Sequence, residues 1–250
     1  MILDEIVRST RERLRHLDQP VDPDPLPRRS LEAAIRTSAG RHAVIAEVKY
    51  ASPSRGRIHD GCTPEAIARE FVAAGAAGLS VLTEPTYFSG SIENLVRVRR
   101  AVSVPVLRKD FIIDERQLAE TRVLGADAVL LIARVLGDHL PAFVDEACML
   151  GLEPLVEVHD RSEMERALAT ETNLIGINNR NLETMTIDLS TTARLAEAAR
   201  DEGRIVVSES GITWPYDVRN LRRHCDAFLI GSALMSARDR QKRLEGFVFA

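Results

Sequence analysis

The spacing of apolar and polar residues changes after residue 42. From there on, short runs rich in Val, Ile, Leu and Ala alternate with longer runs whose apolar residues recur at a helical period. The short runs predict strands at 44–49, 79–83, 104–108, 127–132, 154–158, 173–177, 204–208 and 226–230. The longer runs predict helices at 64–74, 91–101, 115–124, 138–150, 161–169, 190–201, 214–223 and 238–246. Such an alternation indicates repeated strand–helix units.

Eight strand–helix units are the number that closes a parallel barrel. The sequence therefore predicts an α/β protein with a (β/α)8 TIM-barrel fold. An open, doubly wound sheet is the alternative, but no G-x-G-x-x-G motif follows the first predicted strand. Because about 250 residues suffice for one barrel, we expect a single domain over residues 1–250.

Residues 1–42 precede the barrel pattern and predict a helical extension. Apolar residues between Ile2 and Leu17 recur at helical spacing, with charged residues between them. The stretch 20–27 contains four prolines and cannot continue that helix, so we expect it to run extended. A second short helix is predicted near 30–37, where Ser30 is a suitable N-cap.

Composition and charge exclude several classes of protein. Because 33 Lys and Arg residues face 37 Asp and Glu residues, we expect no nucleic-acid partner. No apolar run approaches the roughly 20 residues that cross a bilayer, so we expect no membrane association. The first residues include Asp4 and Glu5 where a signal peptide would be basic, and the three cysteines are far apart. These features favour a cytoplasmic protein without structural zinc or disulfides, and we expect a monomer.

Candidate chemistry lies where the predicted strands end, since active sites of such barrels lie at the carboxyl ends of the strands. Only three residues of the chain are Lys, and two of them, Lys49 and Lys109, lie at the carboxyl ends of the first and third predicted strands. A lysine ammonium can act as an acid or, once deprotonated, as a base or nucleophile, whereas a guanidinium hardly ever loses its proton. Alternatively, these lysines simply extend toward solvent at strand ends.

Several carboxylates are predicted to join the lysines at the barrel mouth. The two-residue period of a strand places Glu47 and Lys49 on one face. Glu157, Asn178 and Glu209 come from the ends of three other strands, and such clusters shift pKa values as acid–base catalysis requires. A set of rim salt bridges is the alternative. Glu157 with His159 is a weak metal pair without an obvious third ligand, so we expect no metal site.

Two turns predict a phosphate site. Ser208-Glu209-Ser210-Gly211-Ile212 and Ile230-Gly231-Ser232-Ala233 follow the last two predicted strands, where barrels of this class often bind phosphate through backbone N–H groups. Together they indicate a small sugar-phosphate substrate. The segment Ser52-Pro53-Ser54-Arg55-Gly56 is a candidate loop that closes over it.

Motifs at the predicted strand ends span nearly the whole barrel in order: Ile45-Ala46-Glu47-Val48-Lys49, Ser80-Val81-Leu82-Thr83-Glu84, Leu107-Arg108-Lys109-Asp110-Phe111, Leu155-Val156-Glu157-Val158-His159, Ile177-Asn178-Asn179-Arg180-Asn181-Leu182, Ser208-Glu209-Ser210-Gly211 and Leu229-Ile230-Gly231-Ser232. In these motifs the sequence resembles the indole-3-glycerol-phosphate synthase family of tryptophan biosynthesis. Tyr50 and Arg55 depart from the family's usual residues. Every catalytic position is nevertheless filled.

The resemblance implies a carboxy-lyase without a cofactor, acting on 1-(2-carboxyphenylamino)-1-deoxyribulose 5-phosphate. It implies catalytic roles for Lys109, Glu157, Lys49, Glu47, Asn178 and Glu209. Substrate binding is implied for Ser52, Pro53, Phe88, Phe111, Leu131, Arg180, Leu182 and Ser210, and phosphate binding for Gly211, Gly231 and Ser232. The division of acid and base roles among Lys109, Lys49 and Glu157 stays open.

Two other functions remain as alternatives. A class I aldolase or another sugar-phosphate lyase would form a Schiff base on Lys49 or Lys109. A barrel retained as a binding or assembly module would need no chemistry, but it would not need this many ionisable residues at the strand ends.

Overall fold

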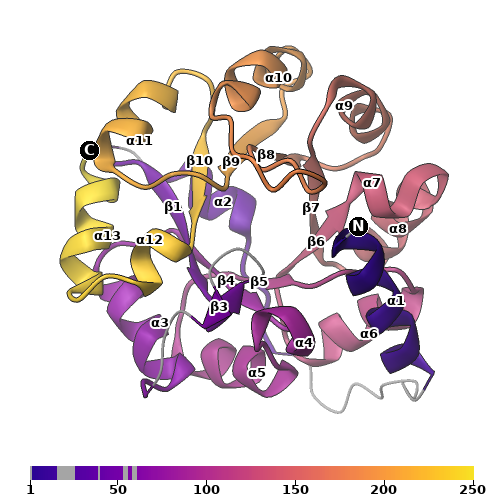
Figure 1. Cartoon of the computed structure of the whole chain (residues 1–250), viewed down its shortest axis with the longest axis horizontal. Helices are drawn as coiled ribbons and strands as arrows, with labels where there is room; N and C mark the ends of the chain where they lie inside the picture. Colours follow the sequence, from indigo (N-terminus) through magenta and orange to yellow (C-terminus); the bar gives the residue numbers. More distant parts are fainter. Residues whose placement is uncertain (1, 16–25, 39, 53–55, 58–60) are drawn as a thin grey trace.

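Eight parallel strands close into a barrel in the computed structural model, which describes residues 2–15, 26–38, 40–52, 56–57 and 61–250. The strands are β1 (Ala43–Val48), β4 (Gly78–Leu82), β5 (Val106–Lys109), β6 (Ala128–Ile132), β7 (Glu153–Val158), β8 (Leu174–Asn178), β9 (Ile205–Glu209) and β10 (Ala227–Ile230). Each strand pairs with its neighbours in the chain, and β1 pairs with both β4 and β10. The predicted TIM barrel is confirmed (Figure 1).

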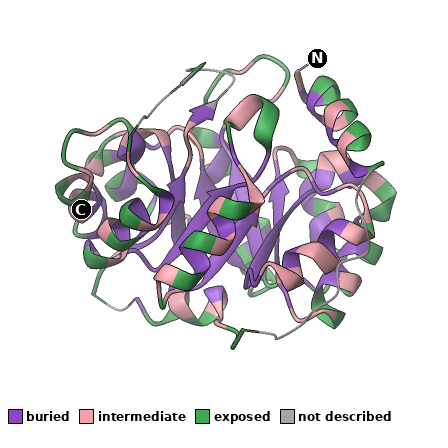
Figure 2. Cartoon of the chain, turned by 90° about the horizontal axis from the view of Figure 1, so that it is seen from below, coloured by how far each residue is buried: buried purple, intermediate pink, exposed green. Residues whose placement is uncertain are grey.

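A ring of helices surrounds the strands. Its members are α3 (Pro64–Ala73), α5 (Ile92–Ala101), α6 (Glu115–Val123), α8 (Leu140–Met149), α9 (Arg161–Leu168), α10 (Ser190–Asp201), α11 (Pro215–Leu221) and α13 (Arg240–Val248). The helices turn their buried faces toward the sheet and their exposed faces outward (Figure 2). The predicted barrel strands and helices agree with the observed ones to within about two residues at each end. None of the described helices has the length and apolar character needed to cross a membrane.

Short elements after several strands were not predicted. They are the hairpin β2 (Ala51–Ser52) and β3 (Gly56–Arg57), the helices α4 (Pro85–Phe88), α7 (Ala133–Leu136) and α12 (Ser232–Met235), and the 3-10 turn Gly137–His139. Elements of two to four residues are too short to show a hydrophobic period, so the sequence pattern does not reveal them.

The strands separate two apolar layers. Residues such as Ile45, Leu130 and Leu155 pack inside the barrel, whereas their strand neighbours, Val129 and Leu131 among them, pack against the helices. Successive side chains on a strand point to opposite faces, so each strand contributes to both layers. Buried on both sides, these strands read as continuous apolar runs.

The extension covers both ends of the barrel. Helix α1 (Ile2–Leu14) brings Ile2, Leu3 and Ile6 to the cavity at the carboxyl ends of the strands. Helix α2 (Leu31–Arg36) is capped by Ser30, whose Oγ accepts the Ala33 N–H, as predicted. Its buried residues Leu31 and Ile35 pack with the inner layer. The prolines at 20, 23 and 25 lie outside the described residues.

We predict that Leu31→Ala lowers the free energy of unfolding by about 2 to 5 kcal/mol, because it opens a cavity inside the barrel. Leu31 is fully buried, whereas Leu26, in the same extension, is 39% exposed. Leu26→Ala is the matched control and should change stability by less than about 1 kcal/mol. Urea denaturation measures both. Equal losses of unfolding free energy in the two variants would show that packing of α2 against the inner layer does not stabilise the barrel.

Candidate active site

A cavity opens at the carboxyl ends of the strands, where the sequence placed the chemistry. Most of the predicted site residues line it: Glu47, Lys49, Phe88, Lys109, Phe111, Glu157, Asn178, Arg180, Leu182, Glu209, Ser210, Gly211, Gly231 and Ser232. The remaining predicted residues are Ser52, Pro53 and Leu131. The structure therefore gathers into one cavity side chains that are up to 185 positions apart in the chain.

The prediction that Leu131 lines the substrate pocket is wrong. Leu131 is fully buried in the outer layer, between β6 and the helices. Its neighbours Leu130 and Ile132 line the cavity instead. The cause is the two-residue period of the strand: a position one residue away from an inward-facing side chain must point outward.

The segment proposed as a closing loop is described only in part. Ala51 and Ser52 form β2, which pairs in antiparallel fashion with Gly56 and Arg57 of β3. Pro53, Ser54 and Arg55 lie outside the described residues, as does the side chain of Ser52. The roles expected for Ser52 and Pro53 therefore stay predictions.

An ammonium between two carboxylates forms the floor of the cavity. Nζ of Lys109, at the end of β5, lies 2.9 Å from Oε2 of Glu209 and 3.3 Å from Oε2 of Glu157. Asn178 donates from Nδ2 to Oε1 of Glu157 at 3.0 Å. Nearby, Nζ of Lys49 lies 2.6 Å from Oε1 of Glu47, which places the two side chains on one face, as predicted.

The charges in this cluster shift the pKa values in different directions. Burial opposes the charged form of Lys109, but Glu209 and Glu157 outweigh it and raise its pKa well above the usual value. Burial raises the pKa of Glu209 to about 7, although Lys109 opposes this shift. Burial also acts on Glu157, yet Lys109, His159 and Asn178 reverse the effect and hold its pKa below the usual range. These shifts favour Lys109 as an ammonium, and of the two carboxylates they favour Glu209 as the one that takes up a proton.

A turn with unusual backbone geometry forms one wall. Ser210 and Gly211 both have left-handed backbones, with φ of 63° and 82°. Non-glycine residues rarely adopt this conformation, and it recurs at functional sites. Asn179 holds the turn by donating from Nδ2 to the carbonyl oxygens of Glu209 and Ser210, at 2.9 and 3.1 Å. Gly231 and Ser232 also line this cavity, as the prediction of a phosphate site requires.

Apolar side chains form another part of the cavity lining. The rings of Phe88 and Phe111 lie 6.1 Å apart in a tilted arrangement, a separation typical of interacting aromatic side chains. Ile2, Leu3 and Ile6 of α1 extend this surface. The cavity thus combines apolar side chains, a buried cluster of charges and a glycine-containing turn.

The sequence matches the family model described as indole-3-glycerol phosphate synthase over residues 3–247. The chain belongs to the indole-3-glycerol phosphate synthase family. An indole-3-glycerol phosphate synthase of Polaromonas naphthalenivorans is 45% identical over 251 residues, 94% of each chain. One from Burkholderia ambifaria is 46% identical over 250 residues, again 94% of each chain.

A solved structure shares the fold at low sequence identity. Thiamine phosphate pyrophosphorylase from Pyrococcus furiosus superposes with a TM-score of 0.61 at 15% identity, covering 82% of this chain and 93% of that one. At this identity the likeness extends to the barrel alone. The indole-3-glycerol phosphate synthase family is therefore assigned from sequence.

Two glycines in this family member make room for the buried carboxylates. A Cβ added to Gly176 of β8 would overlap Oε1 of Glu209, and one added to Gly231 would overlap Oε1 of Glu47. Gly231 was predicted to bind phosphate, and no role was predicted for Gly176. Both contacts cross from one strand to the next, so no local motif reveals them.

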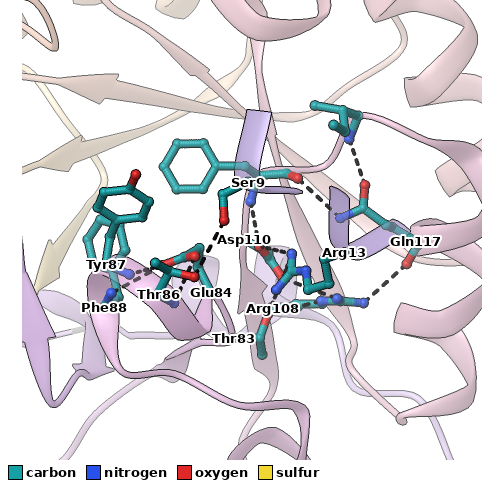
Figure 3. A network of polar contacts seen from close by, with 12 residues as sticks. Ser9, Arg13, Thr83, Glu84, Thr86, Tyr87, Phe88, Arg108, Asp110 and Gln117 are labelled. Atoms are coloured by element: carbon teal, nitrogen blue, oxygen red, sulfur yellow. Dashed lines mark hydrogen bonds and ion pairs between the residues drawn. The ribbon is translucent and has the colours of Figure 1, made fainter. Parts of the chain in front are cut away.

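A buried anchor next to Lys109 and Phe111 could not be found from the sequence pattern. The carboxylate of Asp110 lies 3.0 Å from Nη2 of Arg13 and 3.2 Å from Nη2 of Arg108 (Figure 3). It also accepts the hydroxyl of Thr83 at 2.7 Å and the N–H of Phe111 at 2.8 Å. Asp110 belongs to a motif that supports the resemblance, but its partner Arg13 lies in the extension. The ion pair fastens α1 to the strand that bears Lys109.

A second anchor lies beside it and holds Phe88. The carboxylate of Glu84 caps α4 by accepting the backbone N–H groups of Thr86, Tyr87 and Phe88 (Figure 3). At the same place, the hydroxyls of Ser9 on α1 and Thr86 on α4 are 3.4 Å apart. Helix α1 therefore contacts both elements that carry the aromatic residues of the cavity.

We predict that Gly176→Ala lowers the turnover number at least about tenfold, because the new methyl group displaces the carboxylate of Glu209 from Lys109. Gly246→Ala is the matched control. Its Cβ would meet only Pro215, at 3.6 Å, and it lies within α13. The control should keep full activity and gain up to about 1 kcal/mol of stability from its higher helix propensity. Wild-type turnover in Gly176→Ala would show that the contact between Gly176 and the carboxylate of Glu209 does not matter for catalysis.

We predict that Arg13→Gln lowers the free energy of unfolding at pH 7 by about 1 to 3 kcal/mol, because it removes a charged partner of the buried Asp110. Arg108 and Arg13 lower the pKa of Asp110 against the effect of burial. Because the pKa of Asp110 is lower in the folded than in the unfolded chain, its carboxylate stabilises the fold at pH values above the unfolded pKa, near 4. This stabilisation is lost as the pH falls through the folded pKa.

The difference in the free energy of unfolding between wild type and Arg13→Gln should therefore be largest at neutral pH and should decrease below about pH 4. Urea denaturation over this pH range provides the measurement. Arg11→Gln changes an exposed arginine of the same helix and serves as control. A difference that stays constant with pH would exclude the ion pair as its cause.

Proposed function

We propose that this protein is an indole-3-glycerol-phosphate synthase that converts 1-(2-carboxyphenylamino)-1-deoxyribulose 5-phosphate to indole-3-glycerol phosphate. The reaction closes a ring, releases carbon dioxide and eliminates water. Membership of the family supports the assignment. The observation that carries it is the buried ammonium of Lys109 between Glu157 and Glu209, facing both an apolar wall and a glycine-containing turn.

Lys109 is the general acid of ring closure. When the aromatic carbon attacks the ketone, negative charge develops on the ketone oxygen, and a positioned ammonium stabilises and protonates it. The raised pKa of Lys109 keeps it charged before this step, against the effect of burial. Loss of carbon dioxide then restores the aromatic ring without a cofactor.

The carboxylates serve the later proton transfers. Departure of hydroxide needs an acid and removal of a ring proton needs a base. Glu157 is the base, since it stays ionised, and Glu209 has a pKa of about 7, raised by burial, so that it both holds and releases a proton near neutral pH. Asn178 orients Glu157 through its hydrogen bond.

The remaining residues bind the two ends of the substrate. Lys49, tuned by Glu47, attracts the substrate's carboxylate. Backbone N–H groups of the turns bind its phosphate, with Ser210, Gly211, Gly231 and Ser232 in contact. The aromatic ring lies among Phe88, Phe111 and Leu182, and Arg180 lies at the same rim.

The Schiff-base alternative fits Lys109 poorly. A lysine must lose its proton before its nitrogen attacks a carbonyl, and the neighbouring carboxylates hold Lys109 as an ammonium. Borohydride with substrate present separates the two reactions. We expect no covalent adduct, whereas trapping on either lysine would support an aldolase.

We predict that the purified protein forms a fluorescent indole product from the carboxyphenylamino substrate in the presence of EDTA. Lys109→Met should lower turnover at least about 100-fold, because it removes the acid while keeping most of the side-chain volume. Lys242→Met is the control, since Lys242 is 83% exposed on α13. No product from wild-type protein would refute the proposed function. Activity of Lys109→Met near wild type would refute only the role of Lys109.

A further inference from the structure

His159 follows β7 directly and lies between two carboxylates. Its Nε2 is 3.3 Å from Oε1 of Glu157, and its Nδ1 is 2.9 Å from Oε2 of Glu163 on α9. The imidazole is only 5% exposed. The ring is therefore buried and hydrogen-bonded to Glu163.

Carboxylates on opposite sides of the ring favour the form that carries a proton on each nitrogen. A neutral imidazole has one N–H group and one lone pair, so one of the two carboxylates would face a lone pair. Only the imidazolium presents a proton to both. Its contact with Glu157 is an ion pair that is not well aligned as a hydrogen bond, and Nε2 has no other partner among the described residues.

Glu163 is fixed on the far side of the ring. Its Oε2 also accepts the backbone N–H of His159 at 2.8 Å, and its Oε1 lies 2.6 Å from Nε of Arg134. Arg134 in turn lies 3.2 Å from both Asp160 and Glu183. Because both of its oxygens are paired, Glu163 stays ionised and cannot turn away from the imidazole.

On the side of the ring that faces the cavity, His159 lies next to only one of two similar carboxylates. Glu157 and Glu209 are both buried and both contact Lys109. Glu157 has Asn178 and His159 as additional partners, whereas Oε1 of Glu209 has no hydrogen-bond partner among the described residues. A second positive charge therefore lies next to one carboxylate of the pair and not next to the other.

We propose that His159 is a positioning residue whose imidazolium keeps the Glu157 carboxylate ionised and oriented, and so leaves the exchangeable proton of the cluster on Glu209. The inference rests on the proposed function, because it assigns proton positions for that reaction. His159 is not among the residues that line the cavity, and it acts through Glu157. The charged groups of its surroundings are Glu157 on β7, Glu163 and Asp160 near the start of α9, Arg134 on α7, and Lys109 beyond Glu157.

The pKa values agree with this arrangement. Burial alone would lower the pKa of His159, but Glu157 and Glu163 outweigh it and raise that pKa to about 9. The ring is then charged throughout the physiological range. The pKa of Glu157 lies below its usual value while burial raises that of Glu209 to about 7.

Two neutral replacements separate the charge of His159 from its hydrogen bonds. The new side-chain amide nitrogen would lie close to the position of Nε2 in His159→Gln and close to that of Nδ1 in His159→Asn. The first variant therefore keeps a donor to Glu157 and the second keeps one to Glu163. Loss of the charge raises the pKa values of the cluster's carboxylates. The acid limb of the pH profile of kcat should move to higher pH, by about one unit in His159→Asn and by less in His159→Gln.

The experiment measures kcat and KM of both variants from pH 5 to pH 9, with His139→Gln, an exposed histidine, as control. We expect KM to change less than about twofold, and the control to superpose on wild type. Unshifted kcat profiles in both variants, or a raised KM at constant kcat, would overturn the proposal. Thermal unfolding verifies that each variant is folded.

A second measurement does not depend on catalysis. Nuclear magnetic resonance of the imidazole nitrogens follows the titration of His159 in the wild-type protein, with His159→Gln used to assign the signal. We expect a protonated ring at pH 7 that titrates near pH 9, and a lower titration point in Glu163→Gln, which keeps the histidine but removes its fixed anion. A neutral ring at pH 7 would overturn the proposal even if the enzyme is active. If the wild-type protein forms no indole product, the proposed function fails, and with it the catalytic meaning of His159, whatever its titration.

Discussion

The structure depends on burying three carboxylates beside two ammonium groups at the barrel mouth. Glu47, Glu157 and Glu209 are each 3% exposed or less. A buried charge is strongly unfavourable unless it is paired and hydrogen-bonded, so each of these groups dictates what must surround it. Lys49 compensates Glu47, and Lys109 lies between the other two. Because Lys109 provides one positive charge for two carboxylates, the further charge of His159 decides how the pair ionises.

The need to pair and accommodate these buried charges also determines which residues can stand in the neighbouring strands. The carboxylates fit because Gly176 and Gly231 have no side chains where Glu209 and Glu47 lie. Lys109 keeps its position because the next residue, Asp110, is held by Arg108, Thr83 and Arg13. Positioning groups on rigid strands gives a precision that loops do not offer. The wall of the barrel and the catalytic cluster therefore constrain each other.

Interactions that follow a local period could be predicted from the sequence, and those between distant segments could not. The strands and helices emerged from their hydrophobic spacing, and the ionisable residues emerged because strand ends of a barrel converge. Leu131 shows the limit of this reasoning, since an error of one residue moves a side chain to the opposite face of the strand. Arg13 and Asp110 are 97 residues apart in the sequence, and Arg13 resembles the other charged residues of its amphipathic helix. Neither spacing nor composition therefore identifies the pair. The overlap between Gly176 and Glu209 is equally invisible before the strands are paired.

The ionisable and the apolar side chains of the site come from different elements of the fold. The ionisable groups come from strands or the residues directly after them, whereas much of the apolar wall comes from α1, α4 and the segment after β8, which contributes Leu182, Met185 and Ile187. Arg134 joins these parts, because it pairs both with Glu163, which holds His159, and with Glu183 in the segment after β8. A substitution in that segment can therefore reach Glu157 through Arg134, Glu163 and His159 without touching the substrate. Chemistry and ring binding are thus carried by different elements but are linked by one continuous set of ion pairs.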